Sequence, residues 1–176
     1  MTTGFDPNTA QNLVEIEKQF AVKAVEHAQT YWNLLEKVDP CNLRLTKLDD
    51  EIFEHIKSEF PELAEEPYDT VLKIDEEWMK SAEGKERWRK FMQAYEKKVQ
   101  DYNFGSLIRT DARGEYDEKN TMFVTRMQFY AYEIARNRLG LNDAAHAKAK
   151  ADAEKEKARK EKEREAKNKK KKSNGR

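Results

Sequence analysis

Residues 85–105 read KERWRKFMQAYEKKVQDYNFG and carry the clearest structural pattern of the chain. Large apolar residues recur in this stretch at intervals of one, three or four positions: Trp88, Phe91, Met92, Tyr95, Val99 and Tyr102. This spacing places them on one face of an α-helix whose opposite face carries lysine, arginine and glutamate. Asn103 and Gly105 then interrupt the period, since both tolerate the left-handed backbone that ends helices. We therefore predict a helix up to Tyr102 whose aromatic stripe belongs to the core and is not a cofactor site.

Three other segments have the same helical periodicity. They span residues 8–37, 46–60 and 117–139. Thr46 offers a hydroxyl that can cap the second of them, and Gly140 is a stop signal after the third. Residues 106–116 could be extended, but no second segment that would pair with them is apparent. We predict an all-α fold, a single compact domain of about four to six helices followed by a charged C-terminal tail that is partly helical or disordered.

The charges divide the chain into two unlike parts. It contains 34 Lys+Arg and 34 Asp+Glu, so its formal net charge is zero. Residues 144–176 hold 14 basic and 6 acidic side chains, a balance of +8, which leaves −8 for residues 1–143. Every apolar residue of 144–176 is alanine, so this stretch cannot build a core and is expected to lie outside the folded unit. We predict a flexible N-terminus (1–9), a helical body (10–142) and a basic Ala/Lys/Glu-rich tail (143–176), the kind of segment that often serves as an interaction tail.

The composition also indicates a cellular setting. Cys41 is the only cysteine, so no intrachain disulfide can form and no secretory context is indicated. No run approaches the roughly 20 apolar residues of a membrane span, and the first ten residues lack the regions of a signal peptide. We expect a soluble, cytoplasmic protein without a membrane partner, and we expect it to be a monomer.

The sequence contains no recognisable catalytic motif. It has neither GxxxxGK[ST] nor GxGxxG, the glycine patterns that hold phosphates. His27, His55 and His146 are scattered and form no HExxH or paired ExxH set, so a zinc or di-iron site is not expected. Cys41 has no histidine near it in sequence and is more typical of a small packing residue than of a nucleophile. We predict that the protein is not an enzyme and has no metal or cofactor.

Several charged residues stand among large apolar ones, where unpaired charges are costly. They are Arg109, Asp111, Arg126, Glu133, Arg136 and Arg138. Two interpretations remain open. These residues either form salt bridges that tie residues 106–116 to the last helix of the body, or they form a polar recognition face for a protein partner.

Two further charged groups have alternative interpretations. The triplet Asp49-Asp50-Glu51 lies at the start of a predicted helix, where carboxylates interact favourably with the helix dipole. A binding role and, less simply, a metal or general-acid role are the alternatives. The basic tail either keeps the protein soluble or contacts RNA phosphates, although it has no aromatic residues that would stack on bases.

Four strings together resemble a known family. They are LTKLDDEIFEHI (45–56), KERWRKFMQAYE (85–96), VQDYNFGSLIRTDARGEYDEKNTMFV (99–124) and RMQFYAYEIARNRLG (126–140). The chain resembles a fungal-like member of the eukaryotic family called polysaccharide biosynthesis domain-containing protein 1, over about residues 10–142. The family name suggests sugar chemistry, but the sequence has no pattern typical of a nucleotide-sugar or methyl-donor site.

The resemblance implies an all-helical cytosolic chaperone for translation elongation factor 1-alpha. It implies an ATP-independent action on the nascent GTP-binding domain at the ribosome, in cooperation with the nascent polypeptide-associated complex. The family-like positions that are candidates for client binding, or for a structural polar network, are Asp49, Asp50, Asn103, Gly105, Arg109, Asp111, Arg126, Arg136, Asn137 and Arg138. The candidate ribosome-docking residues of the tail are Lys169, Lys170, Lys171 and Lys172.

Two other functions remain as alternatives. A general ribosome- or RNA-binding module would act through the basic tail alone. A polysaccharide-related transferase rests only on the name of the family.

Overall fold

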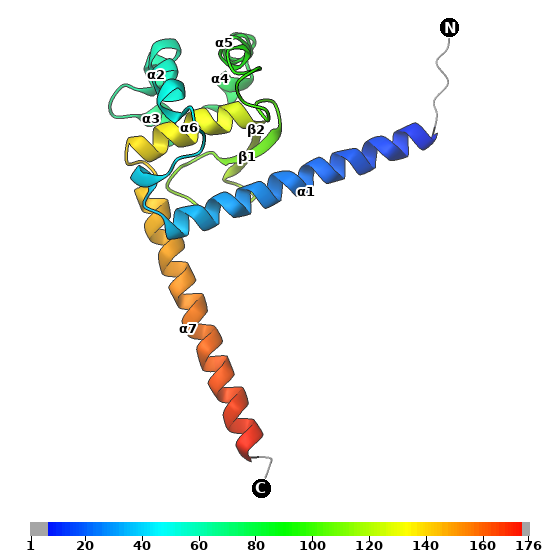
Figure 1. Ribbon diagram of the computed structural model, residues 1–176, viewed down its shortest axis with the longest axis vertical. Helices are drawn as coiled ribbons and strands as arrows, with labels where there is room; N and C mark the ends of the chain where they lie inside the picture. The colour runs from blue at the N-terminus through cyan, green and yellow to red at the C-terminus, as the bar shows by residue number, and fades with distance from the viewer. Residues whose placement is uncertain (1–6, 174–176) are drawn as a thin grey trace.

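The computed structural model describes the backbone of residues 7–173 and the side chains of residues 18–171. Most of the N-terminal segment predicted to be flexible (1–9) lies outside the described residues. The elements in chain order are α1 (Pro7–Lys37), α2 (Asp49–Glu59), α3 (Asp69–Leu72), α4 (Glu76–Lys80), α5 (Ala82–Gln93), β1 (Gly105–Arg109), β2 (Thr121–Thr125), α6 (Arg126–Arg138) and α7 (Asp143–Ser173). Short 3-10 helices at Pro40–Asn42 and Pro61–Leu63 precede α2 and α3. Figure 1 shows a body built around α6, beyond which α1 and α7 extend as two long arms.

The all-α prediction is wrong, because β1 and β2 form an antiparallel sheet in the described part of the chain. The register places Leu107 opposite Phe123. The predicted helix 117–139 instead begins at Arg126, and Thr121–Thr125 is a strand rich in β-branched and aromatic residues. Two strands that pack on helices are stable where an isolated hairpin would be marginal.

A capping box sets the boundary between β2 and α6. The Thr125 hydroxyl accepts a hydrogen bond from the Gln128 backbone N–H, and the Gln128 side chain accepts one from the Thr125 N–H. Two backbone donors of the first turn are satisfied in this way, which fixes the start of the helix. At the other end, Gly140 has a positive φ of 75°, so the predicted stop signal is confirmed.

The helix predicted for residues up to Tyr102 ends earlier, at Gln93. The backbone that follows runs through turns, in which the Lys98 and Val99 N–H groups donate to the Tyr95 carbonyl, and then pairs with the start of α6. The Met127 N–H donates to the Tyr102 carbonyl (3.0 Å), and the Arg126 N–H donates to the Phe104 carbonyl (2.7 Å). The aromatic stripe is nevertheless part of the core, as predicted, since its large side chains from Trp88 onward pack inside.

The core surrounds α6, in which residues 131–137 are buried without interruption. Aromatic rings of the helices before it fill much of the interior. The rings of Phe60 and Trp88 stack with centroids 4.4 Å apart, and Tyr132 of α6 lies 5.7 Å from Trp88. A helix buried on all sides must place its polar groups in contact with partners, and α6 does so with Glu133, Arg136 and Asn137.

The first turns of α7 pack against α1, so the prediction that residues 144–176 lie entirely outside the folded unit is wrong. Ala145 and Ala149 are buried, and the His146 ring Nδ1 hydrogen-bonds to the Leu35 carbonyl. Alanine adds little apolar surface to a core. Its small side chain instead lets two helix backbones approach closely. The rest of α7 extends away from the body (Figure 1).

Candidate functional site

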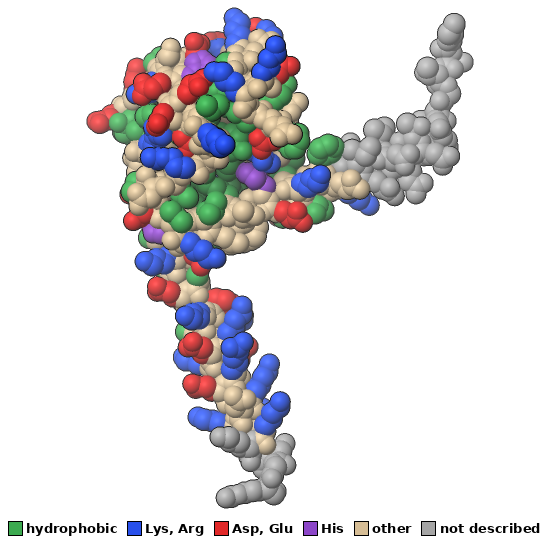
Figure 2. Space-filling model, viewed as in Figure 1, with side chains coloured by type: hydrophobic (Ala, Val, Ile, Leu, Met, Phe, Trp, Pro, Cys, Tyr) green, Lys and Arg blue, Asp and Glu red, His purple; other side chains and the backbone are tan. Residues whose placement is uncertain are grey.

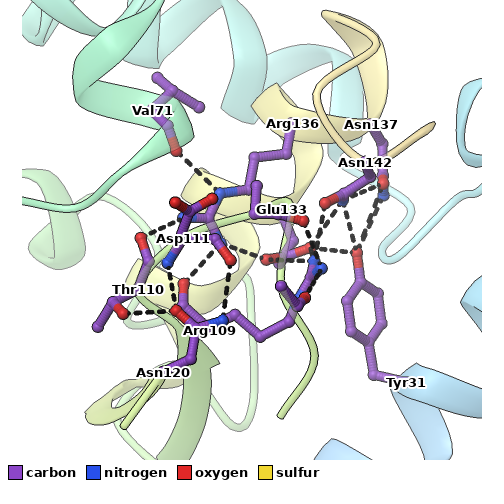
Figure 3. A network of polar contacts seen from close by, with 12 residues as sticks. Tyr31, Val71, Arg109, Thr110, Asp111, Asn120, Glu133, Arg136, Asn137 and Asn142 are labelled. Carbon is purple, nitrogen blue, oxygen red and sulfur yellow. Dashed lines mark hydrogen bonds and ion pairs between the residues drawn. The ribbon is translucent and has the colours of Figure 1, made fainter. Parts of the chain in front are cut away.

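A buried polar network surrounds Glu133 of α6 (Figure 3). The Glu133 carboxylate lies 3.2 Å from Arg109 Nη2 and 2.8 Å from Arg136 Nη1, and all three side chains have no exposed surface. Tyr31 of α1 donates a hydrogen bond from its hydroxyl to the same carboxylate, and Asn142 Nδ2 donates another over 2.9 Å. One carboxylate therefore joins α1, β1, α6 and the loop that leads to α7.

Backbone carbonyls accept most of the remaining guanidinium hydrogen bonds, and Asn142 Oδ1 accepts one from Arg109 Nη2 over 2.7 Å. Arg136 donates to the carbonyls of Val71 (2.9 Å), Arg109 (2.9 Å) and Thr110 (3.2 Å). Arg109 donates to the Ala112 carbonyl (2.8 Å). Its own Nε–H is buried without a hydrogen-bond partner among the described residues. The network thus ties the loop after β1 to the helices, which is the first of the two interpretations of these charges.

The two arginines outweigh the effect of burial on the ionisation of Glu133. Burial alone would raise the pKa of this carboxyl, but the charges of Arg109 and Arg136 lower it to about 2. The Tyr31 hydroxyl is affected in the opposite direction. Burial and the neighbouring Glu133 charge raise the pKa of Tyr31 well above its usual value. The network therefore holds a carboxylate and a neutral phenol over the physiological pH range.

This network is closed to solvent, so it has the properties of a structural hub and not of a ligand site. The prediction included Arg109, Arg136 and Asn137, and the structure brings these together. It missed Tyr31 and Asn142, which contribute from α1 and from the loop after α6. Tyr31 lies on the predicted apolar stripe of the first helix, and its only sequence signal was that a buried hydroxyl needs a partner.

The predicted acidic residues at the start of α2 have separate roles. Asp49 is buried and accepts hydrogen bonds from the backbone N–H groups of Leu45 (2.8 Å) and Thr46 (2.7 Å). It therefore shapes the turn before α2, which begins at Asp49 and not at Thr46. Asp50 is exposed and forms an ion pair with Arg138 over 2.6 Å.

The other predicted positions also form local contacts. Asp111 pairs with Arg113 over 2.7 Å, and hydrogen bonding from Arg113 lowers the pKa of Asp111 to about 2. Arg126 pairs with Asp101 over 2.7 Å. Asn103 is exposed in the turn before β1. The described contacts of Asp111 and Arg126 are thus ion pairs within the chain.

Gly105 is explained by the close approach of an aromatic ring. A Cβ atom at this position would lie 2.5 Å from the Phe123 ring. Glycine in β1 therefore lets the Phe123 ring of β2 lie across the strand, an arrangement typical of glycine beside an aromatic residue in sheets. Phe123 itself is 54% exposed.

The predicted docking lysines of the tail lie at the far end of α7. Lys169, Lys170 and Lys171 are exposed, whereas the side chain of Lys172 lies outside the described residues. Lysine and arginine gather along this arm, with glutamate interspersed (Figure 2). The arm is a solvated helix, stabilised by pairs such as Arg159–Glu156 (2.8 Å).

A groove lies between α1 and the sheet. Its volume is about 590 Å³, and its lining residues are Val25, Ala28, Gln29, Trp32, Leu107, Glu115, Tyr116, Asp117, Glu118 and Thr121. We call it the α1–sheet groove. Phe123 adjoins it, because Phe123 lies opposite Leu107 and on the same face of the sheet. Apolar side chains such as Val25 and Phe123 thus stay accessible at the groove and beside it.

Among the described side chains, those of residues 18–171, no cluster of three or more histidine, cysteine, aspartate or glutamate residues is arranged to hold a metal ion. No helix of this part is both long and apolar enough to cross a membrane.

Comparison with known proteins gives consistent matches. A family model described as PBDC1 protein matches residues 16–147. The chain is 58% identical over 139 residues to "Protein PBDC1 homolog" of Saccharomyces cerevisiae, covering 79% of this chain and 94% of that protein. It is 55% identical over 143 residues to the Schizosaccharomyces pombe protein of the same name, covering 81% and 96%. It is 41% identical over 132 residues to "Protein PBDC1" of Homo sapiens, covering 75% and 54%.

A solved structure has the same fold. A solution NMR structure of a Saccharomyces cerevisiae protein matches with a TM-score of 0.71 and 56% sequence identity, covering 84% of this chain and 99% of that chain.

Proposed function

We propose that this chain, which belongs to the PBDC1 protein family, is a cotranslational, ATP-independent chaperone of translation elongation factor 1-alpha. The family resemblance of the four sequence strings is confirmed, and the chaperone function is what that resemblance implied. In this proposal the protein binds the nascent GTP-binding domain at the ribosome, together with the nascent polypeptide-associated complex. It needs no cofactor, carries out no catalytic step and acts as a monomer in the cytoplasm.

The observation that best supports this proposal is the open edge of β2 at Phe123. The Thr110 N–H donates to the Asn120 carbonyl, and the Arg126 N–H donates to the Phe104 carbonyl. Opposite residues of an antiparallel ladder alternate between hydrogen-bonded and non-hydrogen-bonded pairs, so Leu107 and Phe123 form a non-hydrogen-bonded pair. By that alternation the N–H and C=O of Phe123 point away from β1. No further strand pairs with β2 in the described part of the sheet.

An open edge beside an exposed aromatic ring suits an incompletely folded partner. A strand edge accepts an extended segment through main-chain hydrogen bonds. Incompletely folded chains expose such segments together with apolar surface and aggregate unless these are covered. Release would follow when the folded, nucleotide-bound domain no longer offers the segment, which is a shift of populations and requires no hydrolysis.

Replacing Phe123 with aspartate is expected to weaken capture of the GTP-binding domain by about tenfold, the loss typical of an aromatic contact at the centre of an interface. The measurement is the fraction of newly translated GTP-binding domain that co-purifies with the protein in a cell-free translation system. Phe104→Asp is the matched control, since Phe104 is also about half exposed, at 50%, but precedes β1 and does not belong to the β2 edge. Equal capture by the wild type and Phe123→Asp would contradict the proposed edge, and no capture by the wild type would contradict the function.

The tail supports a second candidate function, that of a general ribosome- or RNA-binding module. Residues 154–176 hold 12 basic and 5 acidic side chains, a balance of +7, and most of their described side chains are exposed on α7. A truncation should remove these residues and retain Ala145 and Ala149, which pack on α1.

Deleting residues 154–176 is expected to reduce co-sedimentation with ribosomes at low salt, because basic side chains contact phosphates electrostatically. Thermal unfolding followed by circular dichroism should be unchanged in this variant. Unchanged co-sedimentation would contradict a docking role for the tail. If the isolated tail kept most of the ribosome binding, with a steep salt dependence, the general-binding function would be favoured over the chaperone.

A further inference from the structure

The α1–sheet groove has an apolar floor. Val25 and Trp32 come from α1, Leu107 from β1, and Tyr116 from the loop between the strands. The rings of Trp32 and Tyr116 meet edge to face with centroids 6.1 Å apart, and Val25 is 58% exposed. The volume of about 590 Å³ lies in the range of pockets that bury small ligands and side chains. A large apolar side chain would therefore be desolvated on entering.

The aromatic floor already holds a cation on its buried side. The Arg109 guanidinium lies 5.7 Å from the Trp32 ring centroid and 5.8 Å from that of Tyr116. A second cation over the same rings would be repelled by this one. The floor is therefore better matched to an aliphatic or aromatic side chain than to lysine or arginine.

The rim of the groove is acidic. Glu115, Asp117 and Glu118 follow one another around Tyr116 and line the groove. Asp117 shapes its own loop by accepting the N–H groups of Lys119 and Asn120, and Glu115 lies 3.6 Å from Lys148 of α7. Glu118 is exposed and forms no ion pair among the described side chains. Negative charge thus remains at the mouth and would attract a basic partner.

The chain's own tail matches only half of this surface. It supplies positive charge, but residues 144–176 contain no apolar side chain larger than alanine. It could neutralise the rim and could not fill the floor.

We propose that the α1–sheet groove binds a peptide segment of another protein in which a large apolar residue is flanked by lysine or arginine. The apolar residue lies on Trp32, Tyr116 and Leu107, while the flanking cations pair with Glu118 and Asp117. The inference concerns the chemistry of the bound segment, so it holds whichever protein supplies it.

The test uses a fluorescently labelled synthetic peptide that alternates lysine with leucine, titrated with the full-length protein and followed by anisotropy. The wild type should bind this peptide at least about tenfold more tightly than a peptide with glutamate for lysine or one with alanine for leucine. Binding should weaken as salt is added, because the rim charges are exposed.

Two pairs of matched variants separate the rim from the floor. Glu118→Lys should weaken binding about fivefold, whereas Glu65→Lys, the same charge change in an exposed loop away from the groove, should not. Val25→Ser should weaken binding, whereas Val22→Ser should not, since Val22 is 56% exposed on the same helix and does not line the groove.

Equal effects within either pair, or equal binding of the acidic peptide, would overturn the proposal. If the peptide fails to bind while the wild type still captures the nascent GTP-binding domain, the groove inference is wrong and the proposed chaperone function stands.

Discussion

Replacing Glu133 with glutamine is expected to lower the free energy of unfolding by about 3–5 kcal/mol at neutral pH. The variant leaves Arg109 and Arg136 buried without the carboxylate that neutralises them, while the shape of the side chain hardly changes. The measurement is urea unfolding followed by circular dichroism at pH 7, fitted with a common m-value. Asp50→Asn is the control, because it also removes a carboxylate paired with an arginine, but at the surface, where the change should be far smaller.

The same variant should change the response to acid. The pKa of Glu133 is about 2 in the folded protein and near 4.5 in the unfolded chain, so the unfolded state binds the proton first as the pH falls. The wild type therefore loses stability between about pH 4.5 and pH 2, and Glu133→Gln lacks this loss, so the two should converge in acid. Protonation of His27 lowers the stability of the wild type and of Glu133→Gln equally, and this loss begins at a higher pH. Burial and then Arg126 lower the pKa of His27 from 6.5 to about 4, which removes stability below pH 6.5.

An equal stability of Glu133→Gln and the wild type at pH 7 would contradict the role of this carboxylate. It would mean that the carbonyl oxygens around Arg109 and Arg136 compensate the two charges without it.

Local periodicity was sufficient to predict most helices of this protein but not its sheet. The spacing of Phe123 and Met127 fits a helix as well as a strand, so the predicted helix 117–139 absorbed β2. The string Thr125-Arg126-Met127-Gln128 was the overlooked signal, since a threonine followed three positions later by glutamine marks a helix start. Moving the boundary there would have left Thr121–Thr125 free to pair with residues 105–109.

The buried network was half predictable. Charged residues among apolar ones indicated salt bridges, and the structure confirms that Arg109 and Arg136 form them. The hydrogen bond from Tyr31 to Glu133, which brings Tyr31 into this network, could not be predicted, because 102 positions separate the two residues and no local pattern relates them. The groove was unpredictable for the same reason. Its acidic rim and its opposite wall come from residues 115–118 and from α1, which are distant in the sequence.

Replacing Gly84 with alanine is expected to destabilise the protein by about 3 kcal/mol, although helix propensity alone would favour alanine by about 1 kcal/mol. Gly84 is a buried residue in the first turns of α5. A Cβ atom there would lie 2.1 Å from the Trp78 carbonyl oxygen and 3.1 Å from that of Met79, both at the end of α4. These are backbone atoms, so no side-chain rotation relieves the contact and the two helices must move apart.

The separation would be transmitted to the aromatic core. Trp88 lies one turn further along α5 and stacks on Phe60, so a shift of α5 relative to its neighbours opens that contact. Lys85→Ala is the control, since it places alanine at the adjacent exposed position of the same helix and should change stability little. Thermal and urea unfolding of both variants give the comparison. If Gly84→Ala were as stable as the wild type or more stable, α4 would be able to move away without loss of stability. Helix propensity, and not close packing, would then determine the effect of this substitution.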